Sequence, residues 1–397
     1  MDPRKNPYAP GAGTKPPALV GRDEQIEAFD ILLHRLENGY SEQSMIITGL
    51  RGVGKTVLLD VFREKAEARE WATIEWEVEK NTVFTSKIAA EIRRALLQIA
   101  PKTQWTARVR KAASILKSFT FTFNPDGAVT AGLEVDALAG AADSGTLAED
   151  LTDLFIAMGA AAQEQKTGVT FLLDEIQFLK PAELEALIVA LHKCARRSLP
   201  ITLVGAGLPQ MPRLAGEAKS YSERLFRFPR VGELDAETDA RNAVILPAQD
   251  LGVDFKPEAV DFIVEYTQGY PYFLQEYGKV VWDESPSSPI ALNDVRSVLS
   301  LVEAKLDESF FRVRAERTTE LELRYLYAMA TLGPDPHRAS EVARCINRTT
   351  EQAGPVRARL IEKGLLYTPG HGYAAFTVPQ FDRYMLRCHA DLAVTDD

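Results

Sequence analysis

A glycine-rich segment has the residue types and the spacing of a phosphate-binding loop. Residues 49–56 read GLRGVGKT and fit the pattern G-x-x-x-x-G-K-[ST], after a predicted strand and at the start of a predicted helix. Glycines let successive backbone N–H groups turn toward an anion, and the helix N-terminus adds its dipole. Lys55 is placed to neutralise the β- and γ-phosphates, and the Thr56 hydroxyl to ligate Mg²⁺. The expected ligands are ATP or ADP with Mg²⁺, and the expected cofactor-binding residues are Gly49, Gly52, Val53, Gly54, Lys55, Thr56 and Val57.

Two carboxylates follow an apolar run farther along the chain. Val169–Leu173 predicts a buried strand that ends at Asp174 and Glu175. Beside a phosphate loop in a parallel sheet, Asp174 would hold the metal ion with Thr56, and Glu175 would take a proton from the attacking water. Either segment alone has a plain structural explanation, a glycine-rich turn or an acidic helix cap. Together they are strong evidence for a P-loop nucleoside triphosphatase in which Glu175 and Lys55 are catalytic.

Strands alternate with helices around these residues, which predicts an α/β fold with a parallel sheet. Residues 1–18, rich in Pro and Gly, form an extended arm without a core of its own. We expect helices from 23 to the Asn38-Gly39 turn, at 56–70 and at 181–197. Strands are expected at 44–48, 72–78, 169–173 and 201–204 and, more weakly, at 225–228.

An insertion at about 82–145 interrupts this rhythm. Two helices (82–99 and 104–117) precede Phe119, Phe121 and Phe123, which alternate with polar residues; a turn at 124–127 and a second alternating run to Val135 predict a β-hairpin. Residues 92–125 carry seven basic and no acidic side chains, and residues 126–165 carry eight acidic and no basic ones. Two interpretations stay open: the two charged faces meet each other or a neighbouring subunit, or the basic half contacts nucleic acid.

The chain becomes almost entirely helical after 235 and ends in a small unit. A long helix is expected at 292–316, followed by helices at 319–332, 339–346 and 355–363 and two short strands around residues 369–372. Three helices leading into a hairpin are typical of a winged helix, whose third helix reads the major groove of DNA. Residues 312–390 hold 12 basic and 8 acidic side chains, a net charge of +4, whereas the whole chain carries −10. The candidate DNA contacts are Arg348, Arg357, Arg359, Lys363 and His371; the alternative is a module for protein contacts.

These motifs together resemble a known group of ATPases. Val20-Gly21-Arg22 before a helix, the GLRGVGKT loop, the LLDE strand end and the GAGLP turn at 205–209 are similar to AAA+ ATPases related to origin-recognition initiators, and to archaeal-type and STAND ATPases. The resemblance covers roughly residues 5–390. It implies that Val20, Gly21 and Arg22 border the adenine. It also implies a helical lid in which Pro271, in a Gly-x-Pro element, packs near the base.

The resemblance also implies residues that act on phosphate, and here the chain departs from the family. Such proteins often carry an arginine finger before the last strand, which makes Arg224 the first candidate and Arg227 the second. Paired surface arginines are the alternative. The strand at 201–207 ends without the usual polar residue, for which Gln210 is a substitute, and no lid arginine is evident. Slow hydrolysis or a nucleotide switch would follow.

Composition and length limit the remaining possibilities. The 397 residues are 46% hydrophobic and 26% charged, as in a globular protein of at least two domains, and no run of 18 apolar residues suggests a membrane span. Three widely spaced cysteines favour a reduced, cytoplasmic protein. The predicted organisation is an arm (1–18), an ATPase domain (19–234), a helical lid (235–316) and a winged helix (317–397). The chain would hydrolyse ATP to ADP and phosphate and couple nucleotide state to double-stranded DNA or a protein partner, with a homo-oligomer as a further possibility. The alternative is a STAND-type signalling switch without DNA binding.

Overall fold

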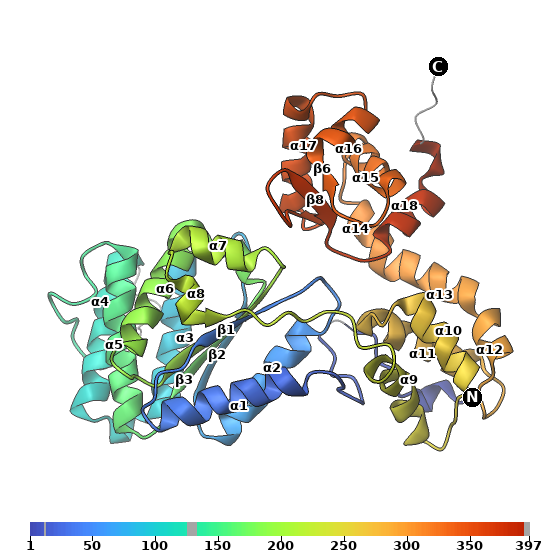
Figure 1. Cartoon of the computed structure of the whole chain (residues 1–397). Helices are drawn as coiled ribbons and strands as arrows, with labels where there is room; N and C mark the ends of the chain where they lie inside the picture. The colour runs from blue at the N-terminus through green and yellow to red at the C-terminus, as the bar shows by residue number, and fades with distance from the viewer. Residues whose placement is uncertain (12, 125–132, 393–397) are drawn as a thin grey trace.

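A five-stranded parallel sheet forms the centre of the N-terminal half. The computed structural model describes residues 1–11, 13–124 and 133–392 (Figure 1). The strand order is β2-β3-β4-β1-β5, and every pairing is parallel. The strands span β1 (Ser44–Thr48), β2 (Ala72–Glu77), β3 (Val169–Asp174), β4 (Ile201–Gly207) and β5 (Phe226–Arg227). The predicted parallel sheet is therefore confirmed, with all five strands at the expected places.

Helices cover both faces of this sheet because successive strand residues point to opposite sides. Leu172 packs in the core under α1 and α2, whereas its neighbours Phe171 and Leu173 pack in the core under the other helices. The first face is covered by α1 (Asp23–Glu37) and α2 (Lys55–Ala68). The second is covered by α3 (Phe84–Ile99), α4 (Ala107–Phe123), α5 (Leu147–Glu164), α6 (Pro181–Ala195) and α7 (Met211–Ala218), with the short α8 (Ser222–Leu225) before β5.

The predicted hairpin after residue 118 is wrong in its first strand. Helix α4 continues through Phe123, and its Phe119 and Phe123 rings lie 4.9 Å apart, one helical turn from each other. Phe121 faces outward and is 47% exposed. The alternation of three phenylalanines thus arose from a helix with one exposed aromatic side chain. Of the second predicted strand, residues 125–132 lie outside the described residues, and Leu133 and Val135 are in no strand.

A helical lid follows the sheet domain (Figure 1). It consists of α9 (Asp239–Gln249), α10 (Pro257–Thr267), α11 (Pro271–Glu284), α12 (Leu292–Ser297) and α13 (Leu299–Leu306). The single helix expected at 292–316 is broken: α13 passes into a π-helical segment, η5 (Asp307–Arg312), and then into α14 (Val313–Ala315). Such π segments are often found at functional sites. This one brings Phe310 and Arg314 to the pocket described below.

Over its described residues the C-terminal unit has four helices and a small antiparallel sheet. Its elements are α15 (Glu320–Leu332), β6 (His337–Arg338), α16 (Ala339–Cys345), α17 (Thr350–Glu362), β7 (Leu366–Tyr367), β8 (Tyr373–Phe376) and α18 (Phe381–Cys388). The sheet order is β6-β8-β7, so the predicted three helices and hairpin occur in the expected sequence. Helix α17 begins earlier than expected, because Thr349 caps it by accepting from the Gln352 N–H, and Pro355 lies within it.

Short 3-10 segments complete the described chain, and none of its helices could cross a membrane. They are η1 (Pro3–Lys5), η2 (Lys102–Gln104), η4 (Ile176–Phe178) and η6 (Ala390–Leu392). Within the ranges given above, every helix is too short or too polar to span a bilayer.

A buried carboxylate organises the C-terminal unit. Glu322 is fully buried and accepts from Arg359 Nε at 3.1 Å and from Lys363 Nζ at 2.6 Å, which fixes α17 against α15. It also accepts from the backbone N–H of Thr319 at 2.7 Å. Burial opposes ionisation, but the hydrogen bonds from Lys363, Thr319 and Arg359 hold the pKa of Glu322 at about 2. Two of the predicted DNA contacts are thus engaged inside the unit.

Replacing this carboxylate is expected to destabilise the unit in a pH-dependent manner. Glu322→Gln should lower the free energy of unfolding at neutral pH by about 2 kcal/mol, because two cations lose their charged partner. Folding depresses the pKa from its ordinary value of 4.5, so this contribution is complete above that pH and is lost as the pH falls toward about 2. Urea unfolding at several pH values measures the difference. Glu320→Gln, which breaks only the exposed pair with Arg324, is the control; equal effects of both changes would contradict the assignment.

Candidate nucleotide-binding site

The loop between β1 and α2 has a backbone that requires glycine. Gly52 and Gly54 adopt φ values of +85° and +89°, in the left-handed region that other residues rarely occupy. A Cβ atom on Gly49 would lie 2.0 Å from the Val231 carbonyl oxygen. These constraints hold the loop at the N-terminus of α2, where N–H groups and the helix dipole favour an anion.

Lys55 lies inside the loop and is almost completely buried. Its Nζ donates to the carbonyl oxygens of Gly49 at 3.0 Å and of Leu50 at 2.7 Å. Burial lowers the pKa of Lys55 to about 8; the Glu175 and Asp174 carboxylates oppose the shift, and the Arg51 guanidinium adds to it. Within the part of the chain that the structure describes, this buried ammonium bonds only neutral carbonyl oxygens, which suits it to an incoming phosphate.

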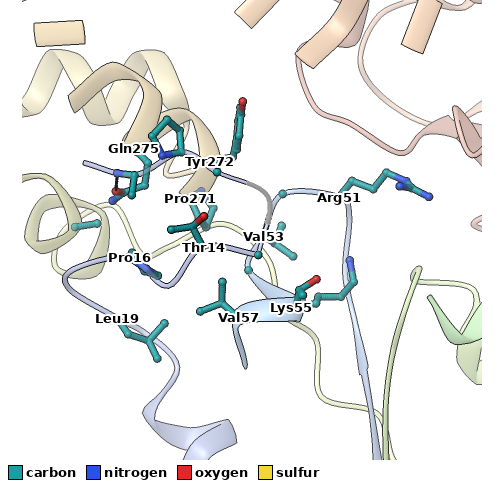
Figure 2. A pocket seen from close by; sticks show the side chains of 18 of the residues that line it. Thr14, Pro16, Leu19, Arg51, Val53, Lys55, Val57, Pro271, Tyr272 and Gln275 are labelled. Atoms are coloured by element: carbon teal, nitrogen blue, oxygen red, sulfur yellow. Dashed lines mark hydrogen bonds between the residues drawn. The ribbon is translucent and has the colours of Figure 1, made fainter. Parts of the chain in front are cut away.

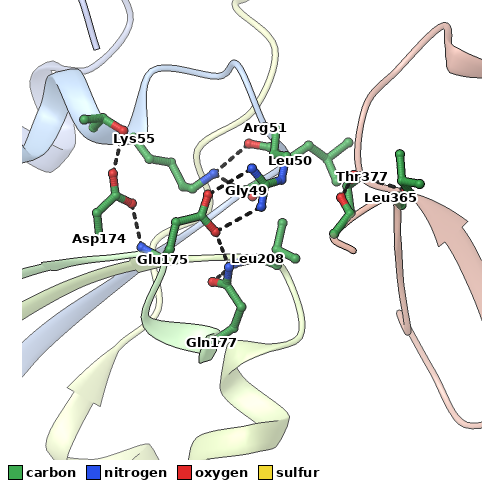
Figure 3. A network of polar contacts seen from close by, with 12 residues as sticks. Gly49, Leu50, Arg51, Lys55, Asp174, Glu175, Gln177, Leu208, Leu365 and Thr377 are labelled. Atoms are coloured by element: carbon green, nitrogen blue, oxygen red, sulfur yellow. Dashed lines mark hydrogen bonds and ion pairs between the residues drawn. The ribbon is translucent and has the colours of Figure 1, made fainter. Parts of the chain in front are cut away.

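The expected metal ligands lie next to each other. Thr56 Oγ1 donates to Asp174 Oδ2 at 2.6 Å, and Asp174 Oδ1 accepts from the backbone N–H of Glu175 at 2.7 Å (Figure 3). A hydroxyl and a carboxylate at the phosphate loop are the hard oxygen donors that Mg²⁺ prefers. The residues present therefore fit a magnesium ion held with a nucleotide.

Glu175 is held by two side chains. Arg51 pairs with it through Nη1 and Nη2, the two terminal guanidinium nitrogens, at 3.3 Å each, and Gln177 Nε2 also donates to it. Gln177 Oε1 accepts from the Leu208 N–H at 3.2 Å, just after β4. Gln177 thus links the end of β4 to the candidate base. Gln210, the substitute expected from the sequence, instead accepts from the Thr368 N–H of the C-terminal unit at 3.3 Å.

A pocket of about 500 Å³ lies over this loop (Figure 2). Val20, Arg22 and Pro271 line it, as the resemblance implied, together with Lys55, Thr56, Val57, Asp174 and Glu175. Gly21 does not line it. The Arg22 guanidinium is buried against backbone carbonyls, with Nη2 bonds to Val53 at 3.1 Å and to Gly232 at 2.7 Å. Arg22 therefore braces the loop.

Arg314 is a pocket residue that the sequence did not indicate. Like Arg51 it lines the pocket, with its guanidinium 4.1 Å from the Phe310 ring centroid and a hydrogen bond to the Phe310 carbonyl. Burial lowers the pKa of Arg314, and repulsion by Arg51 adds to this. Among the described residues no carboxylate pairs with it. An anion in the pocket would supply the missing counter-charge. Its position in a predicted long helix gave no signal of this role.

The candidate arginine finger lies outside this pocket. Arg224 is exposed on α8, and no side chain in the described ranges bonds its guanidinium; only its carbonyl accepts, from Gln43 at 3.1 Å. Glu217, one of the partners considered from the sequence, pairs with Arg213 at 2.6 Å. A contribution of Arg224 would have to come from one subunit to the site of another, and it stays a prediction.

The predicted DNA contacts divide into two groups. Arg357 donates to the Thr368 hydroxyl at 3.0 Å and to the Tyr373 carbonyl, and Arg359 and Lys363 are held by Glu322. Arg348 and His371 are exposed. Arg348 and His371 could therefore contact a partner without breaking a bond inside the unit, whereas the other three could not.

The phosphate loop and acidic strand end agree with the comparison to known families. Residues 18–204 match the family described as the AAA ATPase domain. These residues form an AAA ATPase domain. The C-terminal residues 308–385 match a family described only as a domain of unknown function, DUF8462. No curated protein matches the chain in sequence.

Distant similarity to solved structures covers most of the chain, beyond the AAA ATPase domain. Cdc6p from Pyrobaculum aerophilum is 14% identical with a TM-score of 0.46, over 99% of both chains. Orc1 from Aeropyrum pernix, solved in complex with DNA, is 14% identical with a TM-score of 0.45, over 94% of both chains. The RuvB Holliday junction branch migration motor from Thermotoga maritima is 14% identical with a TM-score of 0.43, over 92% of this chain and 96% of that one. Similarity at this level assigns no activity.

The lowered pKa of Lys55 predicts how ATP affinity depends on pH. Phosphate binding requires the charged ammonium, so affinity should be constant below pH 8 and should fall above it, by about tenfold per unit. Titration of a fluorescent ATP analogue between about pH 7 and pH 10 measures this. In Lys55→Arg, the guanidinium stays charged over this range, and the slope should disappear. A wild-type slope that the arginine variant retains would show that another group titrates.

Proposed function

We propose that this chain is an ATP-hydrolysing switch in which the C-terminal unit responds to the nucleotide and passes its state to a partner. The observation that carries the proposal is the position of Arg51 (Figure 3). Its guanidinium pairs with Glu175 at 3.3 Å, while its backbone N–H donates to the Thr377 carbonyl of the C-terminal unit at 3.1 Å. One residue of the phosphate loop therefore contacts both the candidate base and the unit that would report the nucleotide.

The chemistry assigned to the AAA ATPase domain follows from the site. Thr56 and Asp174 would hold Mg²⁺, which neutralises charge on the β- and γ-phosphates when bound. Lys55 and Arg314 would pair with phosphate oxygens. Glu175 would accept the proton of the attacking water, for which it must first leave the guanidinium of Arg51. Hydrolysis of ATP to ADP and phosphate by a restrained base would be slow until that restraint is released.

The docking of the C-terminal unit supports this coupling. It contacts residues that follow three different strands: Arg51 after β1, Lys80 after β2 and Gln210 after β4. Besides the Arg51 and Gln210 bonds, Lys80 Nζ donates to the Glu362 carbonyl and lies 3.7 Å from its carboxylate. These strand ends form the edge of a parallel sheet where ligands bind. A rearrangement there on nucleotide binding would change the contacts of the C-terminal unit.

Two kinds of partner remain for this unit. Its element order is that of a winged helix, which favours duplex DNA as the partner. A specific observation favours the second function, a signalling switch whose C-terminal unit binds protein. Three of the five predicted DNA contacts, Arg357, Arg359 and Lys363, are occupied within the unit.

Loss of the candidate base should separate binding from hydrolysis. Glu175→Gln is expected to bind ATP with unchanged affinity and to lose turnover by about 10²–10³-fold, because the amide cannot take the proton from water. Phosphate release and nucleotide binding are measured side by side. Glu149→Gln, an exposed change on α5, is the control. Turnover of the Glu175 variant at the wild-type rate would sink the base assignment.

ATP turnover and DNA binding, measured with and without duplex DNA, show whether the C-terminal unit binds DNA or protein. DNA binding should be salt-dependent and should fall severalfold in Arg348→Ala combined with His371→Ala, since both are exposed and their loss leaves the Glu322 network intact. Nucleotide-dependent self-association or protein binding, without any affinity for DNA, would favour the signalling switch instead.

A further inference from the structure

The N-terminal arm crosses the nucleotide pocket and is attached on both sides of it. On the lid side, Asn6 Nδ2 donates to the Lys279 carbonyl at 2.9 Å and to Asp283 Oδ1 at 2.7 Å, and Trp282 Nε1 donates to the Asp2 carbonyl at 3.0 Å. On the sheet side, Lys15 pairs with Glu64 of α2 at 2.8 Å. The arm therefore joins two parts of the chain that bound nucleotide would also join.

Tyr8 is the buried anchor of this arm. It is 3% exposed and packs into a core formed by other elements; the sequence predicted only that the arm has no core of its own. Its hydroxyl donates to the Val244 carbonyl of α9. A Cβ atom on Gly278 of α11 would lie 2.5 Å from the Tyr8 ring, so glycine at 278 makes room for it. The anchor thus depends on the packing of α9 and α11.

The arm forms a wall of the pocket both before and after Lys15. Pro16, Leu19 and Val20 line it with apolar surface, which suits a planar base (Figure 2). At the other end, a Cβ atom on Gly13 would lie 3.5 Å from Thr56 Cγ2, at the metal-binding position. The arm therefore extends along the pocket from the phosphate loop to the lid.

Gln275 connects the arm to the pocket through its side-chain amide. It lies one helical turn after Pro271 on α11 and lines the pocket. Its Oε1 accepts from the Ala9 N–H at 3.2 Å, which fixes the orientation of the amide. The NH₂ group of Gln275 is then the group left to donate, and the hydrogen-bond acceptors on the rim of a purine are its matching partners.

We propose that the arm, residues 1–11 and 13–20, is a strap that retains bound nucleotide, and that Gln275 reads the base. The inference rests on the proposed function, because it assumes that the pocket binds ATP. It differs from a purely structural tether because the strap lines the pocket itself. Nucleotide leaves only as the strap loosens, so Tyr8, which touches no ligand, acts as a positioning residue for retention.

Nucleotide dissociation tests the strap. Tyr8→Ala should raise the dissociation rate of a fluorescent ADP about tenfold, and should weaken ATP and ADP equally, since the strap contacts the part common to both. Arg4→Ala is the control, because its side chain is 89% exposed and bonds only Asp2. Unfolding temperatures without nucleotide show whether the variant stays folded. Wild-type dissociation from folded Tyr8→Ala would overturn the strap.

The preference for adenine over guanine tests the role of Gln275. This test still decides the proposal if Tyr8→Ala does not fold. Gln275→Met keeps the side-chain length but removes both hydrogen bonds of the amide. The ratio of ATP to GTP affinity should change by about fivefold or more, an effect that simple loosening of the lid would not produce. An equal loss for both nucleotides would overturn the assignment. Lys55→Ala separates the two proposals: a wild-type chain that binds ATP no better than this variant sinks the proposed function, not only the strap.

Discussion

The phosphate loop and its pocket hold more positive charge than the nearby groups neutralise, and the surrounding structure must stabilise that charge. Lys55 is buried, and Arg51 and Arg314 are partly buried; the first two belong to the phosphate loop, and Arg314 lines the pocket over it. Holding cations away from water costs free energy unless anions or carbonyl dipoles compensate. In this structure Glu175 and the loop carbonyls compensate two of them, and an aromatic ring and one carbonyl stabilise the third. These groups neutralise the three cations only in part, and a bound triphosphate would supply the remaining negative charge.

The same constraint explains why three distant segments converge on the loop. The backbone groups of Arg51 in this loop bond to elements outside the sheet domain. Tyr270 of the lid donates its hydroxyl to the Arg51 carbonyl, and burial raises its pKa so that the proton stays in place. Thr377 of the C-terminal unit accepts from the Arg51 N–H at 3.1 Å. The lid and the C-terminal unit therefore both bond to the backbone of one residue, Arg51, the lid at its carbonyl oxygen and the C-terminal unit at its N–H.

Local patterns allowed the loop, the strands and the acidic strand end to be predicted, since each is encoded within about ten consecutive residues. Lys55 and Asp174 lie 119 positions apart, yet a known sheet type placed them together. Gln177, Arg314 and Tyr8 could not be found this way, because their roles depend on contacts between distant elements. The phenylalanines at 119–123 misled for a physical reason: an exposed aromatic on a helix imitates the alternation of a strand.

Glycine at 364 leaves room for the Arg51 side chain next to the C-terminal unit. A Cβ atom there would lie 3.0 Å from Arg51 Nη2, so the guanidinium occupies space that a side chain would take. Gly364 also has a φ of +71°, a conformation that favours glycine independently. If Glu175 turns toward water during hydrolysis, Arg51 loses its carboxylate while remaining next to the C-terminal unit. The guanidinium would then need another anionic partner, and the phosphates of the bound nucleotide would be the nearest one. On the proposed mechanism, the phosphate, the candidate base Glu175 and the C-terminal unit would be coupled through the Arg51 side chain.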